Sequence, residues 1–331
     1  MAYALGIDLG GTKILAGVVD VDTGEVLSTA IQLTKGTHGH GDLLERIGDV
    51  AEDALQQAHH TRSEITAAGI GAAGQVDTEQ GVLIRAPNLP STLVGTPISA
   101  ELAHKLGCSV VLVNDVVAAA AGEAGFGAGR GYSDFVCIFV GTGIGGAIYQ
   151  DGHPWTGATN TAGELGHMVI EVGGRTCGCG GRGHLEAYAS HSAVMRTILG
   201  ALRQGRESVL GHLEPNPNPD DRAHSSIRYH ALAEAVTSGD ALAVEMIQEG
   251  ARYLSSGLVS IVNFYNPPLI VLGGGMIKEL DLFYETAAER VRREALQVPG
   301  QKLAVARASL GANSGIVGAA LLAFQESTQR I

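Results

Sequence analysis

The chain contains two hairpin patterns in which a tight turn of glycine and threonine joins two apolar strands. The first pattern covers residues 3–19, with its turn at 10–12. The second covers residues 135–150, with its turn at 141–143. Glycine reaches backbone conformations that such turns require. The repetition predicts a duplicated α/β unit, although two such hairpins can also arise independently.

Strand and helix patterns alternate along the chain, which predicts an α/β protein. The predicted strands are residues 3–9, 14–19, 25–33, 67–73, 109–113, 135–140, 145–150, 269–272 and 303–306. The predicted helices are residues 41–60, 98–106, 190–204, 231–236, 240–263 and 314–325, with a further helix beginning after Asn114. The polar, proline-bearing stretch 212–227 is interpreted as a surface loop.

Charge and hydropathy exclude several classes of protein. The 331 residues suggest about two domains. Twenty-two basic residues against 34 acidic ones give a net charge of −12, which disfavours nucleic acid as a partner. No apolar run approaches the ~18 residues that span a bilayer, and the N-terminus lacks a signal-peptide pattern. We therefore expect a cytoplasmic protein with no membrane partner.

Glycine is abundant, with 47 residues collected in short bursts. Residues 69–74 and 141–146 both match G-x-G-x-x-G, but neither is followed by a helix, which disfavours a dinucleotide-binding fold. Walker-type and protein-kinase motifs are also absent from the sequence. A phosphate cradle remains open, because turn amides and the hydroxyls of Thr12 and Thr142 can bind phosphate oxygens. The alternative is two ordinary hairpins.

Two aspartates follow predicted strands and are candidates for chemistry. Asp8 stands before the first glycine turn, where a carboxylate can hold a Mg²⁺-bound phosphate through water or simply accept turn amides. Asp115 stands between a strand end and a helix start. It can accept a proton from a substrate hydroxyl or merely cap the helix, and the sequence leaves both roles open.

A metal-ligand pattern lies in the middle of the chain. His167, Cys177, Cys179 and His184 fall within 18 residues. Two thiols and two imidazoles are a plausible tetrahedral Zn²⁺ set, which we favour over reduced cysteines in a glycine loop.

Seven segments, taken in order, resemble the ROK family of sugar kinases, particularly bacterial glucokinases. They are residues 7–13 (IDLGGTK), 86–90 (APNLP), 113–116 (VNDV), 140–146 (VGTGIGG), 164–168 (ELGHM), 177–186 (CGCGGRGHLE) and 271–276 (VLGGGM). The resemblance covers nearly the whole chain and implies an actin-like, two-lobed fold with a ribonuclease-H-like sheet in each lobe. We expect one lobe at residues 1–115 with the helix at 314–331, and a larger one at 116–313 with a zinc loop at 167–184.

The same resemblance implies an ATP site with Mg²⁺. The residues it assigns to ATP are Asp8, Gly10, Gly11, Thr12 and Lys13 at the first turn, Gly141, Thr142 and Gly143 at the second, and Gly273, Gly274 and Gly275 beside the adenosine. Glycines at the last position would let the nucleotide approach the backbone.

The family pattern also implies the sugar site and the base. Asp115 would accept the proton of a sugar hydroxyl, which for glucose is the hydroxyl on C6. The residues assigned to the sugar are Asn88, Asn114, Asp115, Glu164, His167 and Glu186. His167 would serve twice, with one ring nitrogen on a structural zinc ion and the other toward the sugar.

Two departures from the family pattern affect the metal and the sugar. His184 stands where the family usually has a third cysteine, so the implied zinc set is His167, Cys177, Cys179 and His184. Residues 91–94 (STLV) replace a segment that often carries glycine and an aromatic residue. Mannose, fructose or an N-acetylated hexosamine are therefore alternatives to glucose. We expect a homodimer or homotetramer.

Two other classes of protein are disfavoured. Sugar-responsive repressors of this family carry a DNA-binding module ahead of the first glycine turn. In this sequence that turn begins directly after Asp8, so a repressor is not expected. An actin-like structural ATPase is disfavoured by the implied sugar-site residues.

Overall fold

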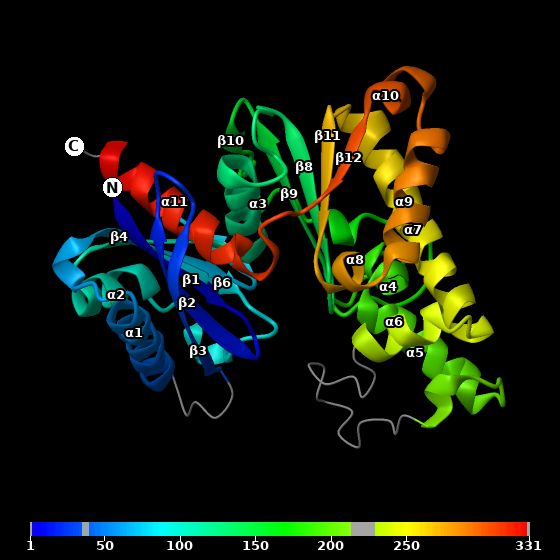
Figure 1. Ribbon diagram of the computed structural model, residues 1–331, viewed down its shortest axis with the longest axis horizontal. Coiled ribbons are helices and arrows are strands. Elements are labelled where there is room, and N and C mark those ends of the chain that lie inside the picture. Colours follow the sequence, from blue (N-terminus) through cyan, green and yellow to red (C-terminus); the bar gives the residue numbers. More distant parts are fainter. Residues whose placement is uncertain (1, 35–39, 213–228, 330–331) are drawn as a thin grey trace. The chain divides into compact units, whose positions relative to one another are not determined.

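A computed structural model describes residues 2–34, 40–212 and 229–329 of the chain (Figure 1). The chain divides into two compact units. The first unit comprises Met1–Ser133, Ala147–Gly163 and Ser309–Ile331, and the second comprises Asp134–Gly146 and Glu164–Ala308. Most of the predicted loop at 212–227 lies outside the described residues.

The first unit contains a five-stranded sheet in the order β3-β2-β1-β4-β7. Its strands are β1 (Tyr3–Leu9), β2 (Lys13–Asp20), β3 (Val26–Leu33), β4 (Ile65–Ala72) and β7 (Ser109–Asn114). The first three pair antiparallel, which confirms the predicted hairpin of residues 3–19, whereas β4 and β7 are parallel to β1. A small antiparallel pair, β5 (Gln75–Asp77) and β6 (Val82–Arg85), follows β4.

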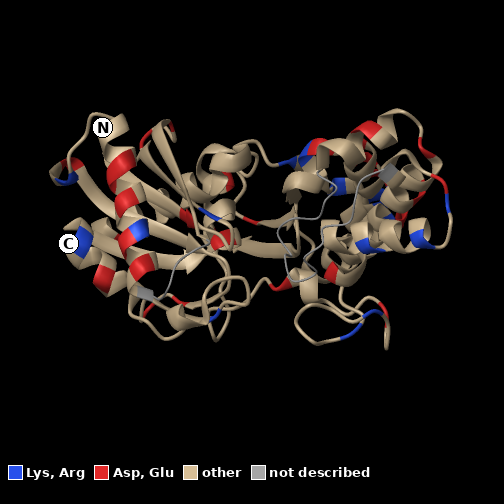
Figure 2. Cartoon of the chain, turned by 90° about the horizontal axis from the view of Figure 1, so that it is seen from below, with Lys and Arg blue, Asp and Glu red and all other residues tan. Residues whose placement is uncertain are grey.

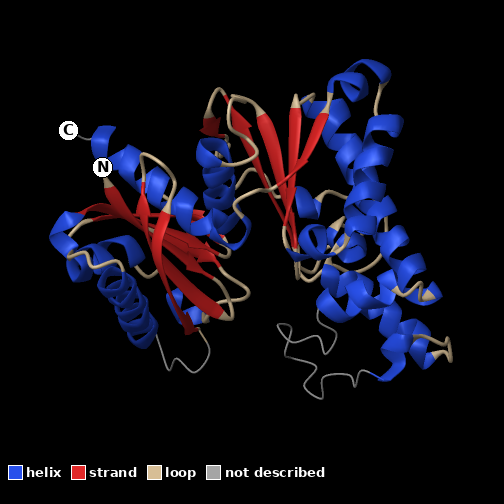
Figure 3. Ribbon diagram, in the orientation of Figure 1, coloured by secondary structure: helices blue, strands red, loops and turns tan. Residues whose placement is uncertain are grey.

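Helices cover both faces of this sheet (Figure 3). They are α1 (His40–Gln57), α2 (Ile98–Leu106), α3 (Asp115–Phe126) and α11 (Ser314–Gln329). Side chains alternate along a strand, so Leu5, Ile7 and Leu9 join the core formed with α1 and α2. Ala4, on the opposite face of β1, packs instead against α11. Asp8 belongs to that same face.

Glycine allows α11 to lie close to the sheet and to α3. A Cβ at Gly6 would overlap the carbonyl of Ile316, and one at Gly318 would overlap the carbonyl of Ala118. The expected boundary between residues 115 and 116 therefore falls inside the first unit of this division, because α3 packs against α11.

Glu123, on α3, ties the start of α11 to the end of α3. The side chain is fully buried. Its carboxylate accepts the backbone N–H groups of Ser309 (3.0 Å), Leu310 (3.0 Å) and Ala128 (2.8 Å). One carboxylate thus accepts hydrogen bonds from three backbone amides, which belong to two loops about 180 residues apart in the sequence.

We expect Glu123→Ala to lower the free energy of unfolding by about 3 kcal/mol or more, because three amides lose their acceptor. Urea unfolding followed by circular dichroism measures the change, with Glu101→Ala in the first turn of α2 as an exposed control. A Glu123→Ala variant as stable as the unaltered protein would contradict the role assigned to this carboxylate.

The second sheet repeats the topology of the first. Its order is β10-β9-β8-β11-β12, with β8 (Phe135–Val140), β9 (Ile144–Gln150), β10 (His153–Pro154), β11 (Leu269–Gly273) and β12 (Ala304–Arg307). As in the first sheet, a hairpin-connected set adjoins two parallel strands, β11 beside β8 and β12 beside β11. The duplication predicted from the two hairpins is therefore confirmed.

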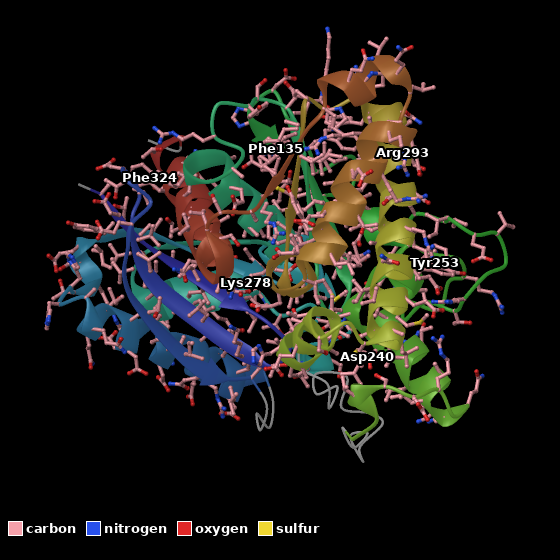
Figure 4. The ribbon with its side chains drawn as sticks, turned by 45° about the vertical axis from the view of Figure 1, so that its right-hand side comes forward. Phe135, Asp240, Tyr253, Lys278, Arg293 and Phe324 are labelled. Carbon is pink, nitrogen blue, oxygen red and sulfur yellow. The ribbon has the colours of Figure 1, made fainter. Side chains whose placement is uncertain are left out.

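The second unit is rich in helices. They are α4 (Glu186–Ala189), α5 (His191–Arg203), α6 (Tyr229–Thr237), α7 (Ala241–Tyr265), α8 (Gly275–Glu279), α9 (Asp281–Glu294) and α10 (Gln297–Lys302). Asp240 caps α7 by accepting the N–H of Ala243 at 2.8 Å (Figure 4). The sequence predicted α5, α6 and α7 but missed the four others.

Charged side chains are interspersed over both units, with acidic residues in the majority (Figure 2). No helix among the described residues is long and apolar enough to cross a membrane.

Candidate active site

The turn between β1 and β2 lies against Asn88. The N–H of Gly10 donates to the carbonyl of Lys13 at 3.0 Å and closes the turn. A Cβ at Gly11 would lie 2.5 Å from the carbonyl oxygen of Asn88, so glycine permits this approach. The structure thus brings a residue predicted for phosphate next to one predicted for sugar.

Thr34, which the sequence analysis missed, supports the same turn. Its hydroxyl donates to the carbonyl of Gly10 at 2.7 Å, and its N–H donates to the carbonyl of Thr12 at 2.9 Å. Thr12 is half-buried and Lys13 is exposed. A single threonine after a strand carries no signal of its own, so only the fold reveals this support.

The carboxyl group of Asp8 is largely withdrawn from solvent. Burial raises its pKa above the usual value, and the positive charge of Lys13 opposes that rise. Among the described residues, no hydrogen bond joins the turn amides to this carboxylate. Of the two roles that the sequence left open, hydrogen bonding to the turn amides is therefore not found among the described residues.

The raised pKa predicts how Asp8→Asn alters stability. The folded chain holds this proton more tightly than the unfolded chain, whose aspartate pKa is about 3.9, so the contribution of Asp8 to stability falls as pH rises above that value. We expect Asp8→Asn to be more stable than the unaltered protein near neutral pH, with a smaller gain near pH 4.5.

Urea unfolding at about pH 4.5 and about pH 8 measures that difference. Asp53→Asn, at an exposed position of α1, is the matched control. An equal gain at both pH values would mean that the ionised carboxylate is not its cause.

Asn114 is the cap of α3, and Asp115 is the first residue of the helix. The Asn114 side-chain oxygen accepts the N–H groups of Val116 (2.9 Å) and Val117 (3.1 Å). Its amide nitrogen donates to the carbonyl of Gly74 at 2.9 Å, which leaves one amide N–H for a ligand. Oδ1 of Asp115 also accepts the N–H of Val116 at 3.0 Å, so both side chains contact the first turn of the helix.

The parallel strands of the first sheet bring Asp8 and Asp115 to one edge. Asp8 stands opposite Gly71 of β4, and Gly71 stands opposite Val113 of β7, two residues before Asp115. A Cβ at Gly71 would lie 3.4 Å from the Cα of Asp115. Ligands of α/β sheets bind at such carboxyl ends of parallel strands.

The segment that departs from the family pattern is well anchored. Residues Ser91–Leu93 form a short 3₁₀ helix whose Leu93 is fully buried. Val94 remains 43% exposed. Asn88, just before this segment, is exposed and available to a ligand.

In the second unit, Glu186 holds the second glycine turn. The N–H of Ile144 donates to Oε2 of Glu186 at 3.0 Å. A Cβ at Gly143 would overlap that same oxygen. Gly141 closes the turn by donating to the carbonyl of Gly143 at 2.9 Å, whereas Thr142 is exposed. Glu186, predicted for sugar, thus also shapes a turn predicted for phosphate.

The four predicted metal ligands converge. One ligand atom from each of His167, Cys177, Cys179 and His184 lies within 4.8 Å of the others. Cys177 Sγ is 3.7 Å from His167 Nδ1, and Cys179 Sγ is 3.3 Å from His184 Nδ1. Tetrahedral zinc with sulfur and nitrogen ligands separates them by about 3.3–3.8 Å, so these residues fit the ion.

Glycine and hydrogen bonds build the ligand loop around His184. A Cβ at Gly181 would overlap the His184 ring. The N–H of Cys177 donates to the carbonyl of Gly181 at 2.8 Å. His184 therefore lies within reach of the other three candidate ligands.

Aromatic packing anchors this loop to the helices. The guanidinium of Arg175 lies 4.7 Å from the ring centre of Tyr188, and Arg175 also pairs with Glu249 at 3.2 Å. Tyr188 packs on Tyr253 of α7, with ring centres 4.5 Å apart; Tyr253 is labelled in Figure 4. The loop thus has a support that is independent of a metal ion.

His167 connects the metal cluster to Glu164. Its Nδ1 faces Cys177, whereas its Nε2 lies 3.8 Å from Oε2 of Glu164. Oε1 of Glu186 accepts the thiol of Cys177 at 3.3 Å. Burial and the charge of Glu186 raise the pKa of the Cys177 thiol to about 12, so metal binding must displace its proton.

Packing within the protein already requires the three glycines after β11. A Cβ at Gly273 would lie 2.5 Å from the ring of Phe139, and one at Gly274 would overlap the backbone of Val140. A Cβ at Gly275 would lie 2.7 Å from the ring of Tyr229. Their lack of side chains is therefore explained without a nucleotide, and their predicted contact with adenosine stays a prediction.

Comparisons with known proteins agree with the predicted family and fold. Residues 4–326 match the sequence profile of the ROK family. The glucokinase of Thermotoga maritima is 32% identical over 96% of this chain and 95% of its own length. The glucokinase of Streptomyces coelicolor is 34% identical over 98% of each chain.

A solved structure extends this similarity to three dimensions. The ROK family glucokinase from Streptomyces griseus, in complex with glucose and AMPPNP, has a TM-score of 0.79 and 34% identity over 98% of this chain and 100% of its own. The prediction of an actin-like α/β fold with duplicated sheets is confirmed.

Proposed function

Because this chain belongs to the ROK family, we propose that it is an ATP-dependent hexose kinase that phosphorylates the 6-hydroxyl of glucose. The observation that carries the proposal is the position of Asp115 at the edge of the first sheet. Asp115 is the first residue of α3 and directly follows Asn114, which ends β7 and caps the helix. The similarity to glucokinases, one with glucose and AMPPNP bound, supports ATP and glucose as substrates.

Asp115 is the proposed general base. The oxygen on C6 of glucose attacks the γ-phosphorus, the bond from that phosphorus to the β-phosphate oxygen breaks, and ADP leaves. The proton of the attacking hydroxyl passes to a carboxylate oxygen of Asp115. Its place in the first turn of α3 stabilises the ionised form that accepts this proton.

The two glycine turns are the proposed phosphate-binding elements. Backbone N–H groups around Gly10, Gly11 and Gly143, with the hydroxyls of Thr12 and Thr142, donate to phosphate oxygens. Lys13 adds positive charge, and Asp8 holds hydrated Mg²⁺. When bound, Mg²⁺ neutralises charge that develops on the transferring phosphoryl group.

The proposed sugar site combines residues that donate and accept. Asn88 and the remaining amide N–H of Asn114 donate to sugar hydroxyls, whereas Glu164 and Glu186 accept from them. His167 presents Nε2 to the sugar while Nδ1 faces the cysteines. A zinc ion held by His167, Cys177, Cys179 and His184 orients that ring and is structural rather than hydrolytic.

A coupled ADP-release assay with Mg-ATP tests the function. The panel comprises glucose, mannose, fructose, N-acetylglucosamine and N-acetylmannosamine, with a sugar-free control. Turnover with glucose supports the proposal, and turnover only with an amino sugar moves the substrate while keeping the reaction. Without sugar-dependent ADP from metal-replete protein, the kinase proposal fails.

We also propose a cytoplasmic homodimer or homotetramer. Light scattering at several protein concentrations measures the molecular mass, and a mass of one chain would contradict this part of the proposal.

A further inference from the structure

Tyr229, which belongs to none of the sequence motifs, lies between the second glycine turn (residues 141–143) and the glycines after β11 (residues 273–275). Tyr229 is the first described residue of α6, and its ring lies 2.7 Å from the place that a Cβ at Gly275 would occupy. The atom closest to that place is Cζ, which carries the hydroxyl. The hydroxyl oxygen itself lies 3.8 Å from the place of a Cβ at Gly141.

His191 connects this ring to the second turn. The ring centres of His191 and Tyr229 are 4.2 Å apart. The N–H of His191 donates to the carbonyl of Gly141 at 2.9 Å. Ser190 caps α5 directly before His191, so the helix start, the glycine turn and the tyrosine ring form one packed group.

The Tyr229 hydroxyl is suited to donate a hydrogen bond. Burial raises its pKa, so the group stays protonated at neutral pH. It makes no hydrogen bond to another side chain or backbone group in the described part of the chain. A half-buried hydroxyl that has no partner among these residues gains free energy from a ligand acceptor.

We propose that Tyr229 is a nucleotide-binding residue whose hydroxyl donates to an α-phosphate oxygen of ATP, with His191 as the residue that positions its ring. This inference rests on the proposed function. Gly141 belongs to the turn proposed for phosphates, and Gly275 is one of the glycines predicted beside the adenosine. The α-phosphate is the group that joins those two parts of ATP, so it is the expected partner of a hydroxyl between them.

Tyr229→Phe is the direct test, because it removes the hydroxyl and keeps the ring against Gly275 and His191. We expect the dissociation constants of AMPPNP, ADP and AMP to rise by about 3- to 10-fold alike, since all three carry the α-phosphate. The KM for ATP should rise by a similar factor, with the KM for glucose unchanged.

Isothermal titration calorimetry and the coupled assay supply these constants. Tyr132→Phe, which removes an exposed hydroxyl in the first unit, is the matched control, and thermal unfolding checks that both variants fold. A merely structural role would shift the unfolding temperature without a selective loss of nucleotide affinity.

Three results would overturn the inference. Unchanged nucleotide affinity in Tyr229→Phe would exclude the hydroxyl contact, and weaker binding of AMPPNP alone would place the contact beyond the α-phosphate. Both results leave the proposed kinase intact if the unaltered protein phosphorylates glucose. An unaltered protein that neither binds AMPPNP nor phosphorylates a sugar overturns both proposals.

Discussion

Replacing Asp115 with asparagine is expected to lower kcat for glucose phosphorylation by about 10²- to 10⁴-fold, the contribution typical of a general base. The amide cannot take the proton of the C6 hydroxyl, but it has nearly the same shape. Asn114 still caps α3 through Val116 and Val117, so the helix start should be preserved.

The coupled ADP assay measures this loss, and circular dichroism checks the fold. Asp53→Asn, on the exposed face of α1, is the matched control with turnover expected to be normal. The KM for ATP should change less than about threefold, because the proposed base touches the sugar and not the nucleotide. An Asp115→Asn enzyme with more than about a tenth of the normal kcat would exclude the base assignment.

Removal of zinc is expected to raise the KM for glucose by about tenfold or more, corresponding to at least about 1.4 kcal/mol of lost binding. The ligand cluster positions His167 beside Glu164. Without the ion, these two proposed sugar contacts lose the constraint that orients them.

Elemental analysis should find about one zinc ion per chain, as expected for a tetrahedral set of four ligands. Kinetics after chelation and after re-addition of zinc then measure the effect. Cys179→Ser should reproduce the loss, whereas Cys108→Ala, outside the cluster, should retain zinc. A zinc-free enzyme with a normal KM for glucose would refute the structural role of the ion.

Zinc affinity should also decrease as pH falls. The protonated Cys177 thiol must release its proton to bind the metal, so added protons compete with zinc.

Local sequence patterns predicted many elements of the fold. The predicted helix at 98–106 and strand at 135–140 match α2 and β8 residue for residue. Proline before the first turn of α2, and a run of apolar residues in β8, act within a few residues of the elements they define. The missed helix α9 (Asp281–Glu294) is mostly polar, and its apolar stripe of Phe283, Ala287 and Val291 gives a weaker signal.

The candidate site divides in the same way. The sequence by itself determined the glycine turns, the order of Asn114 and Asp115, and the four metal-ligand types, because each depends on neighbouring residues and their spacing. The metal cluster converges because its ligands share one short, glycine-rich loop region.

Only the tertiary structure joined the Asn114 amide to Gly74, placed Asn88 against Gly11, and attached Glu186 to the second turn. It also showed that a side chain at position 275, in place of Gly275, would overlap the ring of Tyr229. Glu186 and Ile144 are 42 positions apart in the chain, and Asn88 and Gly11 are 77 positions apart. Local propensity does not encode such pairs, because they form only when separate strands, loops and helices pack into one core.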